Sequence, residues 1–155
     1  MHKVSYKESG SITVEFVFVL LPVFLTVFFL IVMTVQTVER DMIRYATIVA
    51  AREARDFQGH ANPSLYKTEF TKKFMYAIED LPLVSKQITD YTFNVQGFRN
   101  TQSLLSDQHM DISACTNCLF AAYSVSADAP FFGFGSFVNS QIKSSIIMGQ
   151  EHEGW

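Results

Sequence analysis

Glu15 is the residue whose position most strongly indicates chemistry. It stands at the edge of an apolar run, residues 16–35, that contains no charged residue and is about as long as a bilayer-spanning helix. A carboxylate at the bilayer centre costs about 2.5–3.5 kcal/mol on insertion scales, so an ionisable group in a membrane segment is a functional hypothesis by default. Gly10 lies five residues before Glu15, at the end of a short polar and basic leader.

Cys115 and Cys118 form the second group, with the spacing Cys-Thr-Asn-Cys. This spacing fits a small structural disulfide loop, a redox pair or half of a zinc site. Zinc needs two further ligands, and only His109 lies nearby in the sequence, so we expect no complete metal site. A redox enzyme of the thioredoxin type needs a βαβ pattern, which the sequence does not show. We expect a disulfide if the domain faces an oxidising compartment.

Asp107, His109 and Asp111 form the third group, and they provide a weak catalytic candidate within a polar stretch. The Gly133-Phe134-Gly135 segment lacks the lysine and the helix of a phosphate-binding loop. The net charge is −3, and the basic residues form no stripe, so we expect no nucleic-acid partner. We therefore predict that the chain is not an enzyme and holds no cofactor.

The element that positions Glu15 is the apolar run itself, which we predict to be a single transmembrane helix. Lys3 and Lys7 in the leader give a weak positive bias that favours a cytoplasmic N-terminus. Pro22 lies inside the run, where a proline removes one backbone hydrogen bond and tends to kink the helix. Two interpretations of Pro22 remain open: a bend used in assembly, or an ordinary transmembrane proline.

The leader, Gly10, the segment Ser11-Ile-Thr-Val-Glu15-Phe and the following apolar helix together resemble the processing and assembly signal of type IV pilin-like proteins. The short leader makes the chain most similar to TadE-type pseudopilins of the tight-adherence (Flp) pilus system, and TadF-type relatives share the signature. The resemblance implies cleavage by a prepilin peptidase between Gly10 and Ser11, which makes Glu15 the fifth residue of the mature chain.

The resemblance also implies the function and the partners. The expected protein is a pseudopilin or minor pilin of the bacterial inner membrane that assembles a Flp-type adhesion pilus. Glu15 would either lie at the headgroup level or pair with the free amine of a neighbouring subunit and set the register between subunits. The expected partners are the prepilin peptidase, other pilin or pseudopilin subunits, the assembly machinery and membrane lipid.

Three alternatives remain beside this interpretation. A secretory signal peptide fits poorly, because the apolar core is too long and no A-x-A pattern follows it. An uncleaved signal anchor would make the chain a single-span subunit of an envelope or secretion complex. A membrane-tethered thiol oxidoreductase would use Cys115 and Cys118.

The fold predicted from the pattern is α+β. A leader, residues 1–10, precedes a long helix over residues 11–57, whose transmembrane part is 16–35, and a small extracytoplasmic α+β domain follows over 58–155. Beyond the membrane part, the long helix has an amphipathic stripe, and a second amphipathic helix spans Ser64 to Leu81 between two prolines. The predicted stripe residues are Val38, Met42, Tyr45, Ala46, Val49, Ala50, Ala54 and Phe57, and the apolar face of the second helix consists of Leu65, Phe70, Phe74, Ala77, Ile78 and Leu81.

Alternation of apolar and polar residues predicts strands over 87–95, 118–127 and 141–148. We expect Gln96-Gly97 to turn the chain, residues 99–117 to form a polar loop with the cysteine pair, and residues 128–130 to end the second strand. Four phenylalanines between 131 and 137 indicate an aromatic turn, either packed as core or exposed to a partner. The strands should form a small antiparallel sheet against the 36–57 helix.

Overall fold

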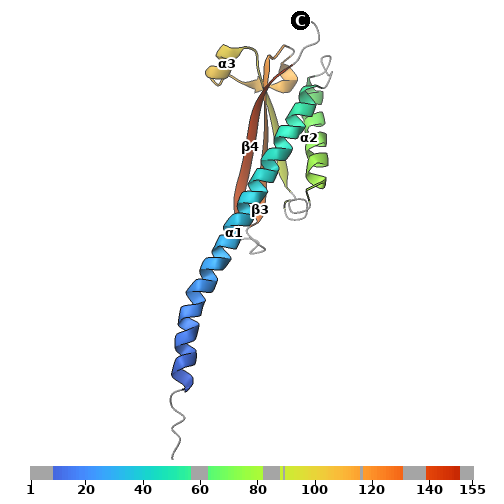
Figure 1. Cartoon of the computed structure of the whole chain (residues 1–155). Coiled ribbons are helices and arrows are strands. Elements are labelled where there is room, and N and C mark those ends of the chain that lie inside the picture. The colour runs from blue at the N-terminus through green and yellow to red at the C-terminus, as the bar shows by residue number, and fades with distance from the viewer. Residues whose placement is uncertain are drawn as a thin grey trace, which may run out of the picture. The chain divides into compact units, whose positions relative to one another are not determined.

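The first element, α1, is an uninterrupted α-helix from Ser9 to Arg55 in the computed structural model of the chain (Figure 1). The structure describes residues 9–56, 63–81, 88, 90–115, 117–130 and 139–150. Pro22 is the one proline inside α1, and the helix continues across it. The chain divides into two compact units, Met1–Val38 and Glu39–Trp155, and α1 contributes to both.

In the second unit, α1 buries one stripe of mostly small residues. Ile43, Ala46, Ala50 and Ala54 are fully buried and recur every three or four residues, which is the spacing of one helix face. The predicted stripe was wrong at Tyr45, which is 60% exposed. Thr47 and Ala51, each next to a stripe residue in the sequence, are also fully buried, so the buried face is wider than a single row of residues.

The second helix, α2, spans Ser64–Glu79 and presents a face of large side chains. Its buried residues Tyr66, Phe70, Phe74 and Ile78 lie four apart. The prediction of this helix is confirmed, but Leu65 is 41% exposed, and Tyr66 occupies the buried position instead. A salt bridge of 2.9 Å from Lys73 Nζ to Glu53 Oε2 joins α2 to α1.

The sheet has four antiparallel strands in the order β2-β1-β3-β4. The strands are β1 (Tyr91–Phe98), β2 (Met110–Asp111), β3 (Phe120–Pro130) and β4 (Asn139–Gly149). The short helix α3 (Thr101–Leu105) and the 3₁₀ turn η1 (Ile112–Ala114) lie between β1 and β3 in the chain. The pairing of β3 with β4 runs residue for residue over eleven pairs, so no bulge interrupts it.

One sheet face packs against α1 and α2 to form the core of the second unit. Val95, Tyr123 and Ile146 make one row across this face. The ring of Phe70 lies 5.0 Å from that of Tyr123, and the ring of Phe74 lies 5.2 Å from that of Phe93, centroid to centroid. The opposite sheet face is polar, with Thr92, Asn94, Ser124, Ser126, Lys143 and Ser145. This one-sided burial explains the alternation in the sequence.

The α+β fold with a long helix, a second helix and a small antiparallel sheet is confirmed, but three further local predictions were wrong. Gln96 and Gly97 do not turn the chain, because they pair with Asp111 and Met110 on β2 and continue β1. Asp128 does not end the second strand, because β3 stays paired with β4 as far as Pro130. The predicted polar loop over residues 99–117 contains α3, β2 and η1. The aromatic cluster between 131 and 137 lies outside the described residues, as do Gln87 and Thr89 of the first predicted strand.

Candidate functional site

The apolar segment of α1 is exposed within the first unit. The large hydrophobic side chains described between Val14 and Met33 are 41–73% exposed, with the exception of Val32, which is 1% exposed. An 18-residue window within this helix has a mean hydropathy of 3.0, and the helix is long and apolar enough to cross a membrane. Isolated surface leucines are ordinary, but a contiguous apolar surface of this size marks a site of contact with a membrane or another protein.

The threonines of this segment satisfy their hydroxyl groups within the helix. Thr26 Oγ1 donates to the Pro22 carbonyl oxygen and Thr34 Oγ1 to that of Leu30, both at 2.8 Å. In hydrocarbon, polar groups need internal partners because no water is present to replace them. This back-bonding to the carbonyl four residues earlier makes threonine compatible with a lipid-facing helix. The bend predicted at Pro22 stays a prediction.

Gly10, Ser11 and Glu15 are all residues of α1. The Glu15 side chain is exposed between Val14 and Phe16, which are 55% and 63% exposed. The carboxylate therefore stands at one end of the apolar surface and is accessible to a partner. Gly10 and Ser11 belong to the first turn of α1, five and four residues before Glu15, so the predicted cleavage site and the predicted register carboxylate share one helix end.

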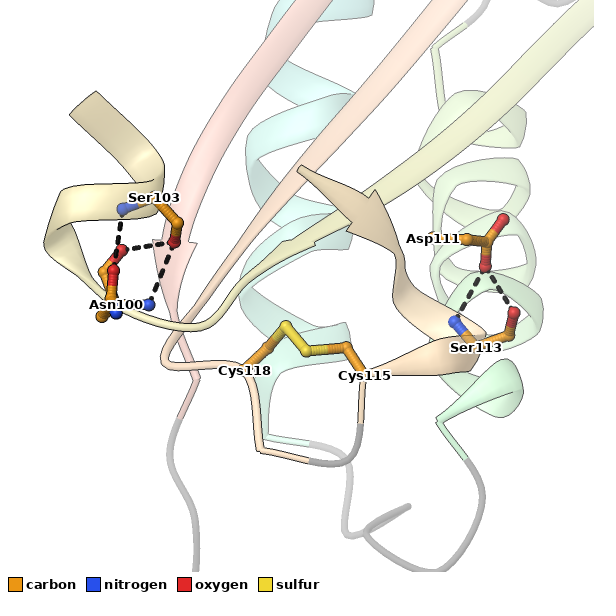
Figure 2. Close-up of a disulfide and its surroundings, with 6 residues drawn as sticks. All are labelled: Asn100, Ser103, Asp111, Ser113, Cys115 and Cys118. Atoms are coloured by element: carbon orange, nitrogen blue, oxygen red, sulfur yellow. Dashed lines mark hydrogen bonds between the residues drawn. A yellow bond between two sulfur atoms is a disulfide. The ribbon is translucent and has the colours of Figure 1, made fainter. Parts of the chain in front are cut away.

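The two cysteines form a disulfide, Cys115–Cys118, in the second unit (Figure 2). Cys115 is 4% exposed and Cys118 is 2% exposed, so an external thiol has little access to either sulfur. Gly97 of β1 lies directly against the bridge: a Cβ atom at this position would overlap Cys118 Sγ and lie 3.2 Å from Cys115 Cβ. Burial of the bridge is typical of a structural disulfide.

Asp107, His109 and Asp111 do not converge on one point. Asp111 caps η1, accepting hydrogen bonds from the Ser113 backbone N–H at 2.8 Å and from Ser113 Oγ at 2.5 Å (Figure 2). These bonds lower the pKa of the Asp111 carboxyl. His109 Nδ1 lies 3.1 Å from the Asp107 carbonyl oxygen and 3.7 Å from Asp107 Oδ1. Among the described residues, no three His, Cys, Asp or Glu side chains could hold a metal ion together.

Two features escaped the sequence analysis. Glu39 is 7% exposed, and burial raises the pKa of its carboxyl. Its spacing from Ile43 and Ala46 places it on the buried stripe of α1, which is the signal that could have identified it. The other feature is a groove of about 570 Å³ lined by Arg40, Asp41 and Arg44 of α1 and by residues 141–145 of β4. The groove depends on the strand order, which the sequence does not provide.

Gly10, Glu15 and the apolar segment thus all belong to α1. The disulfide and the groove lined by Arg40, Asp41 and Arg44 both belong to the second unit. Comparisons of the chain with protein-family models, with curated proteins and with solved structures found no match.

Proposed function

We propose that this protein is a pilin-like subunit of TadE type, which is inserted in the bacterial inner membrane, cleaved by a prepilin peptidase and used to assemble a Flp-type adhesion pilus. The observation that carries the proposal is the arrangement at the start of α1. Gly10, Ser11 and the exposed Glu15 lie on the same helix end, directly before a long exposed apolar surface. A helix of this kind can be held in lipid before assembly and packed against other such helices afterwards.

Cleavage after Gly10 would create a free amine on Ser11. Inside a bundle of helices, this amine and the Glu15 carboxylate of a neighbouring subunit would form an ion pair in a medium of low dielectric constant. The attraction between the two charges is stronger there than in water, although desolvation of both charges removes much of the gain. The consequence is specificity: each subunit is held at a defined axial offset from its neighbour.

The second unit is suited to the outer side of the membrane. Its disulfide Cys115–Cys118 fits an oxidising compartment such as the periplasm. In this arrangement the leader stays in the cytoplasm, the segment 16–35 crosses the membrane, and the α+β unit faces the periplasm. The partners of the protein would be the peptidase, other pilin or pseudopilin subunits, the assembly machinery and membrane lipid.

The test is the mature N-terminus of the full chain, measured by mass spectrometry of protein extracted from membranes with and without a prepilin peptidase. We expect the chain to begin at Ser11 only when the peptidase is present. Gly10→Val should abolish this cleavage, because the resemblance places glycine directly before the scissile bond and valine puts a branched side chain there. Glu15→Leu is the matched variant: it should still be cleaved but should not enter a pilus, because the register charge is lost.

A start at Met1 in every sample would overturn the proposal. The chain would then be an uncleaved single-span subunit of an envelope or secretion complex. A mature-length product from Gly10→Val would refute the assignment of the cleavage site, and normal piliation with Glu15→Leu would refute the register role alone.

A further inference from the structure

Among the strands that the structure describes, β4 lies at the edge of the sheet. It has eleven residues and pairs with β3 on one side, and no described strand pairs with its other side (Figure 1). Proteins usually protect such an edge with bulges, prolines or several charges. β4 contains no bulge, no proline and no acidic residue, and Lys143 is its one charged residue. Within the described residues, no strand occupies the backbone N–H and C=O groups along this edge.

The free edge borders a basic groove. Arg40, Asp41 and Arg44 of α1 line the groove together with Gln141–Ser145 of β4. The groove lining contains three cations (Arg40, Arg44 and Lys143) and one anion (Asp41), so its net charge is +2. None of these four groups forms a salt bridge with another residue in the described part of the chain. The groove thus offers unpaired cations beside unpaired backbone groups.

We propose that this groove binds an extended, acidic segment of a partner protein, which adds to the sheet as a fifth strand next to β4. Backbone hydrogen bonds to β4 would supply affinity, and alternate side chains of the added strand would supply specificity. Side chains on the α1 side of the sheet would meet Arg40 and Arg44, and those on the opposite side would meet Lys143. Carboxylates at these places would complement the charge of the groove.

Two other occupants fit the groove less well. A second copy of the chain paired through its own β4 would bring another Lys143 and another pair of arginines to the same place, and like charges would oppose the contact. Anionic lipid headgroups complement the charge, but they lack the alternating donors and acceptors that a strand edge requires. An acidic extended segment satisfies both the charges and the backbone.

The test uses the full chain in nonionic detergent micelles and the labelled synthetic peptide acetyl-Thr-Val-Glu-Val-Glu-Val-Thr-amide, with binding followed by fluorescence anisotropy. We expect saturable binding that is about ten-fold tighter than binding of the same peptide with lysine in place of glutamate. Arg40→Gln with Arg44→Gln should weaken binding about ten-fold. Arg52→Gln is the matched control, because Arg52 is an exposed arginine of α1 outside the groove, and its variant should bind normally.

Strand addition makes a stronger prediction about the peptide backbone. Successive N–H groups of a strand point to opposite edges, so one set of alternate nitrogens faces β4 and the other faces solvent. We compare two methylated peptides: one is N-methylated at the three valines, and the other at the two glutamates and the last threonine. One of them should lose binding and the other should keep it. Equal binding of the two methylated peptides would overturn the proposal, as would the absence of saturable binding.

Displacement of the peptide by phosphatidylglycerol in the micelles, together with equal binding of the two methylated peptides, would assign the groove to lipid instead. If the cations served only to protect the edge, the Arg40 and Arg44 variants would self-associate without any change in peptide binding, which would also overturn the proposal. None of these results depends on whether residues 1–10 are cleaved, so failure here and failure of the pilin-like function are distinguishable.

Discussion

At the residue scale, the contact between Gly97 and the disulfide is a sharp constraint. A methyl group at Gly97 would overlap Cys118 Sγ and come within 3.3 Å of Ile112 Cδ1. We predict that Gly97→Ala lowers the free energy of unfolding by about 1–3 kcal/mol, the usual cost of an overpacked site. In a Cys115→Ala/Cys118→Ala background, the same substitution should cost less than half as much, because Sγ is absent. Denaturant unfolding of the four proteins in micelles measures the coupling.

Gly149 provides the matched control for this prediction. It also lies in a strand, but among the described residues a Cβ atom there would meet only the Leu119 carbonyl oxygen at 3.9 Å, so Gly149→Ala should be nearly neutral. An equal cost of Gly97→Ala with and without the disulfide would contradict the packing argument. The sequence indicated the cysteine pair by its spacing, but the role of Gly97 could not be read from it. Glycine is a frequent turn residue, and only the contact with the Cys115–Cys118 disulfide shows why glycine is required at position 97.

At the element scale, the end of α3 contains the one described non-glycine residue with positive φ, Asp107 at 54°. The Asp107 N–H donates to the Leu104 carbonyl at 3.3 Å, and the Gln108 N–H donates to that of Ser103 at 2.8 Å. This is a Schellman ending, in which glycine is the preferred residue. We predict that Asp107→Gly unfolds at the same or a higher denaturant concentration than the parent chain. Asp107→Ala should be about 1 kcal/mol less stable than Asp107→Gly.

Ser106 is the control for this turn, because its φ is −90°. Ser106→Ala and Ser106→Gly both lose the serine hydroxyl group, so they differ from each other only in the Cβ atom. At Ser106 alanine should be more stable than glycine, so the order of the two variants reverses between adjacent positions. The same order at both positions would show that Asp107 acts through its side chain. This turn lies in the stretch that the sequence analysis assigned to a polar loop. Five residues are too few for an amphipathic period, so α3, which begins with a capping box between Asn100 and Ser103, gives no periodic signal.

At the scale of the whole molecule, two kinds of hydrophobic pattern distinguish the two units. The continuous apolar run predicts the exposed segment of α1, and the three-to-four residue stripe predicts the buried face that begins near Glu39. Strand order is a different matter. Alternation identifies which residues of β3 and β4 face the core, but it does not reveal which strand lies at the edge. The groove beside Arg40 and Arg44 exists only because β4 is outermost, so it could not be predicted from the sequence.

Tyr123 links the core of the second unit to pH. It is fully buried, its Oη accepts a 2.9 Å hydrogen bond from Gln150 Nε2, and burial raises its pKa to about 12. In the unfolded chain a tyrosine titrates near 10. Below about pH 10 both states are protonated, and between about pH 10 and 12 only the unfolded state loses the proton, so stability should fall by about 2–3 kcal/mol.

Tyr123→Phe should cost about 1 kcal/mol at neutral pH, from the lost hydrogen bond, and should remove most of this alkaline decline. A residual slope is expected because burial also raises the pKa of Tyr66 and Tyr91. Tyr45→Phe, at a position 60% exposed, should leave the decline unchanged. Denaturant midpoints across this pH range test the prediction, and an equally steep decline in Tyr123→Phe would refute it.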